Sequence, residues 1–311
     1  MRTVVRDWFA VFREAVRFWM DANAISYAGA LAFFTLFSIA PVVILAVQVI
    51  GLVMSTDAAM AQIMTQLNDT VGPEAAQTVR EAVERSRLDS SGIVPTLVGI
   101  GAMLVGATTV FGQMQRSLNN IWDLAPRPSR NTILALLKSR LMSLTVVLSI
   151  GFVLLVSLFL SVLVQSVMVF ARDWLPIPAG LAVGLESLVS VAVITLLFAT
   201  IFKVLPDAVL RWRDVRLGAL ITALLFILGR FLIAFYLSHT ATASTYGAAG
   251  SLVLLLLWVY YSSLILLFGA AITRAHTEAR GVRVQPSASA VRVYRRFTEN
   301  PADDHPADPP A

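Results

Sequence analysis

Long apolar runs separated by short polar pieces dominate this chain. Six runs are each long enough for a helix to cross a hydrocarbon layer, which needs about 20 residues. They are Tyr27–Met54, Val94–Gly112, Leu141–Phe170, Ala179–Leu205, Val215–Leu237 and Tyr246–Ile272. The pattern predicts an all-α integral membrane bundle of six transmembrane helices.

Basic residues alternate in abundance between the pieces that separate these runs. The first, third, fifth and seventh polar pieces together hold 19 of the 24 Lys and Arg residues, and the other three pieces hold four. Lys203 and Arg216 lie at the ends of neighbouring runs and are counted in the piece between those runs, residues 206–214. Because cytoplasmic loops retain basic residues, the alternation predicts a multi-pass membrane protein with both termini cytoplasmic. The net charge of +5 is then explained by orientation, and we expect no nucleic-acid partner.

The first polar piece, residues 1–26, predicts an amphipathic helix on the cytoplasmic side. Trp8, Phe12 and Trp19 recur at helical spacing, which is typical of one apolar face. Two interpretations are open: a surface anchor that senses anionic lipid, or a helix that packs on the bundle.

The membrane domain is expected to span residues 27–276 and to include one long external piece, residues 55–93. Two short apolar stripes broken at Gly72-Pro73 predict an external helical hairpin there, between spans 1 and 2. The hairpin is interpreted as a lid, a docking site or a passive cap. Residues 277–311 are polar and end in a segment rich in Pro, Asp and Ala, which predicts a largely disordered cytoplasmic tail.

Two charged residues lie well inside the apolar runs, away from the run ends where Lys203 and Arg216 lie; ionisable groups in such positions are functional candidates. Glu186 and Arg230 each lie seven residues from the external ends of sequential, antiparallel runs, or about 10 Å below the outer boundary at ~1.5 Å per residue. The matched depth predicts an ion pair between helices. Its role as a structural clamp or as part of a transport site stays open.

Small residues recur on one face of each of the last two runs. Such residues allow transmembrane backbones to approach closely, so helix packing is favoured over a substrate path. The face comprises Gly218, Thr222 and Gly229 in the fifth run, and Gly247, Ser251, Ser262 and Gly269 in the sixth.

Four further residues are candidates for a buried polar path. Tyr260 and Tyr261 have hydroxyl groups that need partners in a dry setting, so they are expected to line a polar cavity. Pro41 removes a backbone hydrogen bond and predicts a kink that exposes carbonyl groups near Ser38.

The residues that catalysis would need are not grouped in this sequence. The chain has no cysteine, and its three histidines are scattered without acidic neighbours at metal-ligand spacing. No glycine-rich phosphate loop follows a strand. We therefore expect no enzyme activity, no cofactor and no metal.

Several segments, taken together, resemble one family. They are Ala30–Pro41, the segment Leu118-Asn119-Asn120-Ile121-Trp122, Lys203–Asp207 with Trp212–Val215, and Tyr246–Ala270. In order and in residue type they closely resemble the YihY/BrkB family, over residues 20–276.

The resemblance implies a six-span bacterial inner-membrane protein but no agreed activity, because members carry labels such as virulence factor, serum resistance and ribonuclease BN. Ribonuclease activity fits these residues poorly. Two departures from the family pattern stand out: Ala271 replaces a glutamate, and Arg230 replaces a common lysine.

Two functions remain after these exclusions. The leading hypothesis is a transporter or transport component for envelope lipid or a small solute, suggested by the charge pair, the tyrosines and a basic cytoplasmic rim. The alternative is a non-catalytic scaffold that docks an envelope partner on the external hairpin. The expected partners are membrane lipids, with a second copy or an envelope protein as further candidates.

Overall fold

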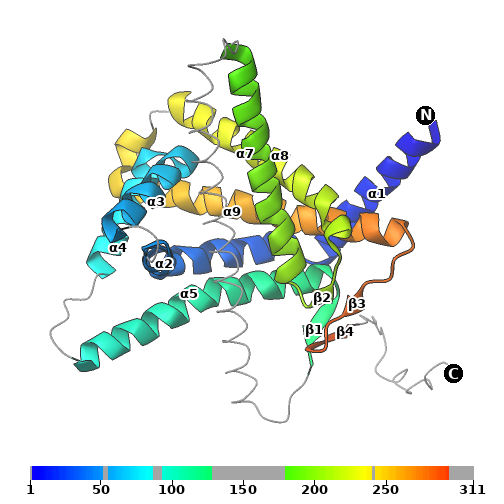
Figure 1. The fold of residues 1–311 in the computed structure, drawn as a ribbon, viewed down its shortest axis with the longest axis horizontal. Helices are drawn as coiled ribbons and strands as arrows, with labels where there is room; N and C mark the ends of the chain where they lie inside the picture. The colour runs from blue at the N-terminus through cyan, green and yellow to red at the C-terminus, as the bar shows by residue number, and fades with distance from the viewer. Residues whose placement is uncertain (1, 52–54, 87–92, 128–178, 240–241, 294–311) are drawn as a thin grey trace.

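In the computed structural model, helices pack around one long central helix. The structure describes residues 2–51, 55–86, 93–127, 179–239 and 242–293. The described helices are α1 (Arg2–Asp21), α2 (Ala24–Ile50), α3 (Thr56–Val71), α4 (Pro73–Ser86), α5 (Ile93–Ile121), α7 (Ala179–Val204), α8 (Trp212–His239) and α9 (Thr242–Ala279). Helix α9 contacts α1, α2, α4, α5 and α8, and α7 packs along α8 (Figure 1).

Four described helices are long and apolar enough to cross a membrane. They cover Ala24–Gln48, Ser187–Val204, Trp212–Ile233 and Leu252–Ala279. These segments fall in the first, fourth, fifth and sixth apolar runs. The third run lies outside the described residues, so six spans and their orientation stay predictions.

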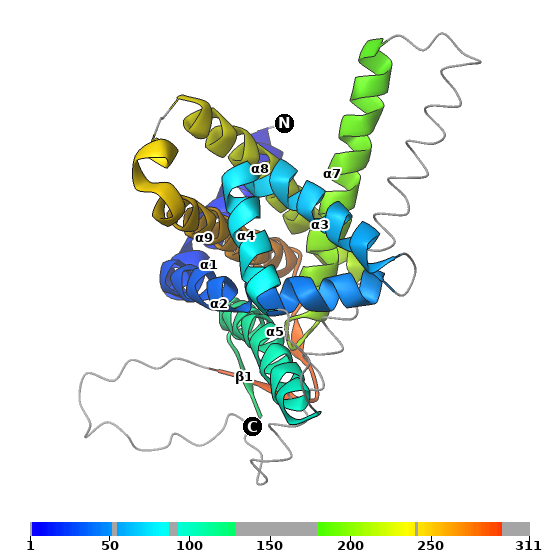
Figure 2. The same ribbon diagram turned by 90° about the vertical axis from the view of Figure 1, so that its left-hand side faces the viewer.

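Local sequence signals explain where α3 and α4 begin and end. The Ser55 hydroxyl accepts a hydrogen bond from the Ala58 amide (3.3 Å), and Gly72 ends α3 with φ +88°. Pro73 then opens α4, where a missing amide hydrogen costs nothing. The two helices contact each other and α2, and α4 also contacts α9 (Figure 2); their location outside the cell stays a prediction.

The helix α2 contains Pro41 and changes direction along its length (Figures 1 and 2). A proline inside a helix removes one backbone hydrogen bond and crowds the preceding turn, which accounts for a bend. The proline ring also lies against Gly106 of α5, so the bent helix remains closely packed.

The expected all-α fold needs one addition, because two pairs of short antiparallel strands lie at one end of the bundle. β1 (Leu124–Pro126) pairs with β4 (Ala290–Arg292), and β2 (Ala208–Val209) pairs with β3 (Gln285–Pro286). Strands of two or three residues have no measurable alternation, so the sequence pattern did not predict them.

Residues 277–293, the first part of the segment expected to be a largely disordered tail, form the end of a helix, a turn and two short strands. Helix α9 continues to Ala279 and ends at Gly281 (φ +72°), where the Val282 amide donates to the Thr277 carbonyl (3.2 Å). This Schellman-type end turns the chain back across the bundle. Residues 282–293, which we call the C-terminal strap, contain β3 and β4; residues 294–311 lie outside the described residues.

Two hydrophobic clusters form the core. The larger one gathers the ends of α5, α7 and α9 with the start of α8, and it includes Leu118, Phe202 and Leu267. The smaller one joins α2, α3, α4 and α9 through residues such as Val79 and Trp258. Trp122, which directly follows α5, is only 4% exposed within the larger cluster.

Candidate functional site

The two intramembrane charges are described to different extents. Arg230 in α8 is half-buried, and its guanidinium group lies 5.8 Å from the centre of the Phe231 ring. Glu186 belongs to α7, but its side chain lies outside the described residues. The ion pair between them therefore stays a prediction.

The helices α8 and α9 meet through a reciprocal set of glycines and threonines. A methyl group added at Gly218 would overlap the Thr273 hydroxyl, and one added at Gly269 would overlap the Thr222 hydroxyl. Each hydroxyl donates to the glycine carbonyl four residues before it in its own helix (2.6 and 2.8 Å). The two helices can approach this closely because both glycines lack a side chain.

Tyr261 extends the same contact toward the middle of α8. Its ring lies against Gly229, and its hydroxyl donates to the Leu225 carbonyl (2.9 Å). Tyr260 is partly buried against the larger core cluster. The described partner of the Tyr261 hydroxyl is therefore a backbone carbonyl of the neighbouring helix.

The remaining candidates are placed as follows. Ser38 is buried in α2. The Ser262 hydroxyl is buried without a hydrogen-bond partner among the described residues. Gly247 and Ser251 lie in α9, in a stretch whose side chains are outside the described residues.

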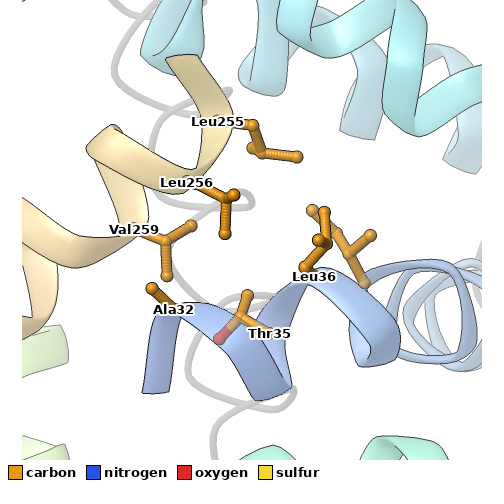
Figure 3. Close-up of a pocket in the computed structure, with 7 residues that line it drawn as sticks. Ala32, Thr35, Leu36, Leu255, Leu256 and Val259 are labelled. Carbon is orange, nitrogen blue, oxygen red and sulfur yellow. The ribbon is translucent and has the colours of Figure 1, made fainter. Parts of the chain in front are cut away.

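A small hollow between α2 and α9 is apolar (Figure 3). Ala32, Leu36, Leu255 and Val259 are among the residues that line it, and Thr35 is its one polar side chain. The hollow offers no set of converging polar groups, so it resembles a packing gap more than a solute site.

The densest polar arrangement in the described part of the chain surrounds Asp207, in the turn between α7 and α8. The Asp207 carboxylate accepts hydrogen bonds from the side chains of Asn119 (2.8 Å), Gln115 (3.3 Å) and Ser289 (2.9 Å). Its amide donates to the Asn119 side chain (2.8 Å), and its carbonyl accepts from the Ser287 amide (2.8 Å). This Asp207 network joins α5, the α7–α8 turn and the C-terminal strap.

Arg274 makes a second junction beside the first. Its guanidinium group donates to the Ile121 carbonyl (2.6 Å), pairs with Asp123 (2.7 Å) and Glu278 (2.9 Å), and stacks 3.9 Å from the centre of the Phe18 ring. Because the planar group satisfies several partners at once, it ties α9 to α1 and to the end of α5.

The hydrophobic pattern and the intramembrane charges did not point to Asn119, Asp207 or Arg274 as candidate site residues. Asn119 and Asp207 belong to segments that carry the family resemblance. Asn119 lies near the C-terminal end of α5, and Asp207 follows the end of α7. Asn120 in the same segment donates to the Ala22 carbonyl (2.6 Å). The sequence shows polar residues near several helix ends, which is a signal for such contacts. It does not show that Asn119 and Asp207, which are 88 residues apart, bind each other.

The arrangement can hold helix ends together, and no group of three metal-binding side chains occurs in the part of the chain that the structure describes. The donors around Asp207 are amides and a hydroxyl. Because these donors already occupy the Asp207 carboxylate, the Asp207 network is suited to holding α5, the α7–α8 turn and the C-terminal strap in position.

The chain was compared with known proteins. A family model described as "Virulence factor BrkB" matches residues 15–293. No solved structure matches the chain significantly.

Curated relatives match over most of their length. A UPF0761 membrane protein of Mannheimia succiniciproducens is 27% identical over 82% of this chain and 85% of its own. A UPF0761 membrane protein of Alteromonas mediterranea is 28% identical, with coverage of 88% and 89%. The ribonuclease-like protein YfkH of Bacillus subtilis is 27% identical, with coverage of 79% and 88%.

Proposed function

This chain belongs to the virulence factor BrkB family of membrane proteins, and we propose that it transports anionic lipid of the bacterial inner membrane, or is a component of that transport. A small solute is the alternative cargo. Arg230, a cation held half-buried inside an apolar span, is the observation that carries this proposal.

The surroundings of Arg230 favour a lipid over a solute. Its neighbours Leu228 and Phe231 are mostly exposed on the surface of α8, which in a membrane faces the acyl chains. A guanidinium group in that position is costly unless an anion neutralises it. The phosphate of a lipid headgroup is such an anion and accepts paired hydrogen bonds from arginine.

Lipid transfer in reconstituted vesicles tests the proposal. Wild-type protein in vesicles that contain fluorescent phosphatidylglycerol should move lipid between leaflets faster than protein-free vesicles, as read by quenching from outside. Arg230→Ala should slow this transfer about ten-fold or more, because a charged hydrogen bond is worth about 1.5–3 kcal/mol. Arg230→Lys keeps the charge and should retain most of the transfer.

Equal transfer by wild-type protein and by protein-free vesicles would contradict lipid transport. If transfer occurs but Arg230→Ala does not affect it while the protein stays folded, Arg230 is a structural residue and the assigned role is wrong.

The scaffold alternative receives less support from the geometry. The described apolar side chains Ala59, Ala75, Val79 and Val83 of α3 and α4 are buried in the smaller core cluster. The exposed face carries charged residues such as Arg80 and Glu84. A partner would have to bind this polar face, so we propose transport first. We propose no ribonuclease activity, because that label comes from the names of relatives such as YfkH and not from residues of this chain.

A further inference from the structure

The turn between α7 and α8 presents its cations outward and its acids inward. Asp207 is held in the Asp207 network. Asp214 is only 5% exposed, accepts from the Arg211 amide (3.1 Å) and lies 3.6 Å from Arg280. Arg213 and Arg216, in contrast, are exposed. The sequence of this turn contains both signs of charge, but the surface that the fold presents is cationic.

An aromatic side chain completes this surface. Trp212 is 47% exposed, and the Lys203 ammonium group lies 4.8 Å above its ring. Tryptophan side chains collect at the headgroup level of membranes, and Trp212 is the residue at which the candidate span of α8 begins. We call Lys203, Trp212, Arg213 and Arg216 the α7–α8 ledge.

An apolar row on α8 continues directly from the ledge into the membrane. Leu220, Leu224 and Leu228 follow Arg216 at intervals of four residues, so the four side chains lie one above another on the same helix face. The three leucines are 41%, 51% and 51% exposed. A molecule with an anionic head and apolar chains is complementary to this combination.

We propose that the α7–α8 ledge binds the headgroup of an anionic phospholipid whose acyl chains lie along Leu220, Leu224 and Leu228. Guanidinium groups bind phosphate through paired, charge-assisted hydrogen bonds. Basic side chains near a membrane surface each add about 1 kcal/mol of attraction for anionic lipid. The site does not depend on transport, because a lipid bound here can be structural as well as cargo.

Native mass spectrometry of the full chain tests the ledge directly. Purified protein is titrated with dioleoylphosphatidylglycerol or dioleoylphosphatidylcholine, and the retained adducts are counted. Wild-type protein should retain phosphatidylglycerol preferentially. The double variant Arg213→Gln/Arg216→Gln should weaken that retention about thirty-fold, which corresponds to the two lost attractions.

A charge-matched control separates a site from general attraction. Arg13→Gln/Arg283→Gln removes two exposed cations from α1 and the C-terminal strap and should leave retention unchanged. If both double variants lose phosphatidylglycerol equally, or if neither loses it, the ledge is not a binding site. Both variants change exposed side chains, and an unchanged melting temperature verifies that each is folded.

Two further arms define the ligand. Glycerol 3-phosphate supplied in place of lipid should not be retained, and its retention would overturn the assignment to a lipid. Arg213→Gln/Arg216→Gln should weaken phosphatidylglycerol retention about thirty-fold in the Arg230→Ala background as well, because the ledge does not include Arg230; no loss in that background would move the site to Arg230. Lipid transfer and lipid retention are separate readouts, so the transport proposal and this one fail independently.

Discussion

At the scale of single residues, two glycines and two threonines set the distance between α8 and α9. Gly218 faces Thr273 and Gly269 faces Thr222, so each backbone approaches the other helix where a threonine side chain lies. Both threonine hydroxyls donate within their own helices, so neither is left unpaired in the contact. The same four residues therefore let α8 and α9 approach each other closely and give the two threonine hydroxyls their hydrogen-bond partners.

We predict that Gly269→Ala destabilises the protein by about 1–3 kcal/mol, the usual cost of adding a methyl group to a packed contact. The new methyl group would overlap the Thr222 hydroxyl and approach the Phe202 ring. Adding Thr222→Ala should recover part of the loss. Thermal unfolding in detergent measures both effects.

Gly184→Ala is the matched control, because an added methyl group there meets nothing within 4 Å. It should leave the melting temperature unchanged or raise it slightly, since alanine favours the helix. An equal loss of stability at both positions would show that the α8–α9 contact is not the cause.

At the scale of elements, the C-terminal strap joins segments that the membrane helices leave apart. Its strands pair with β1 after α5 and with β2 before α8. Ser289 reaches the Asp207 carboxylate, and the Ser289 carbonyl accepts from the Arg127 amide (2.9 Å). Helix α1 is tied in from the other side, where Trp19 donates to the Leu264 carbonyl (3.4 Å) and Phe12 contacts Phe268. This packing favours the interpretation of α1 as a helix of the bundle.

The register of the strap predicts a disulfide between Ala125→Cys and Val291→Cys, which are direct partners in the β1–β4 pair. Directly opposed residues of antiparallel strands have Cα atoms about 4.5–5.5 Å apart, within the range that a disulfide needs. Mild oxidation should form the bond in the folded protein, and gel mobility with and without reductant measures it.

The chain contains no native cysteine, so any bond arises from the introduced pair. Ala125→Cys/Val293→Cys is the control, since Val293 continues the ladder two residues beyond Val291, and such diagonal neighbours lie about 7–8 Å apart, too far for a disulfide. Equal cross-linking of both pairs would contradict the register.

At the scale of the whole molecule, the four polar pieces that are rich in Lys and Arg meet at one end of the bundle, in the parts of them that the structure describes. Hydrogen bonds and ion pairs connect Asn120 with Ala22, Arg274 with Asp123, and Asp207 with Ser289. Helices α3 and α4 lie toward the opposite end (Figure 1). The shared end agrees with the alternation of basic residues, which predicts that this end is cytoplasmic.

Single cysteines test that orientation. In spheroplasts, a membrane-impermeant maleimide should label Asp57→Cys at the start of α3. It should label Arg283→Cys in the strap only after the membrane is permeabilised. Both residues are exposed, so access to the reagent depends on the side of the membrane. The reverse labelling pattern would overturn the predicted topology.

The sequence by itself determined most of the helices and the class of protein. Apolar runs, a serine cap before α3, Pro73 at the start of α4 and Gly281 after α9 are local signals, and each acts on residues within a few positions of itself. Composition also determined that this is a membrane protein, whereas the BrkB family was indicated by the resemblance of particular segments and shown by the family model that matches residues 15–293. The small-residue spacing placed Gly218, Thr222 and Gly269 on common helix faces, because helical periodicity is a property of the chain alone.

Only the tertiary structure decided which distant residues meet. Asn119 lies 88 residues from Asp207, and Arg274 lies 153 residues from Ile121; no periodicity relates such positions. The strap strands are too short to form alone and exist because β1 and β2 supply their hydrogen-bond partners. The inward acids and outward arginines of the α7–α8 turn likewise follow from packing, since burial depends on what covers a side chain and not on its place in the sequence.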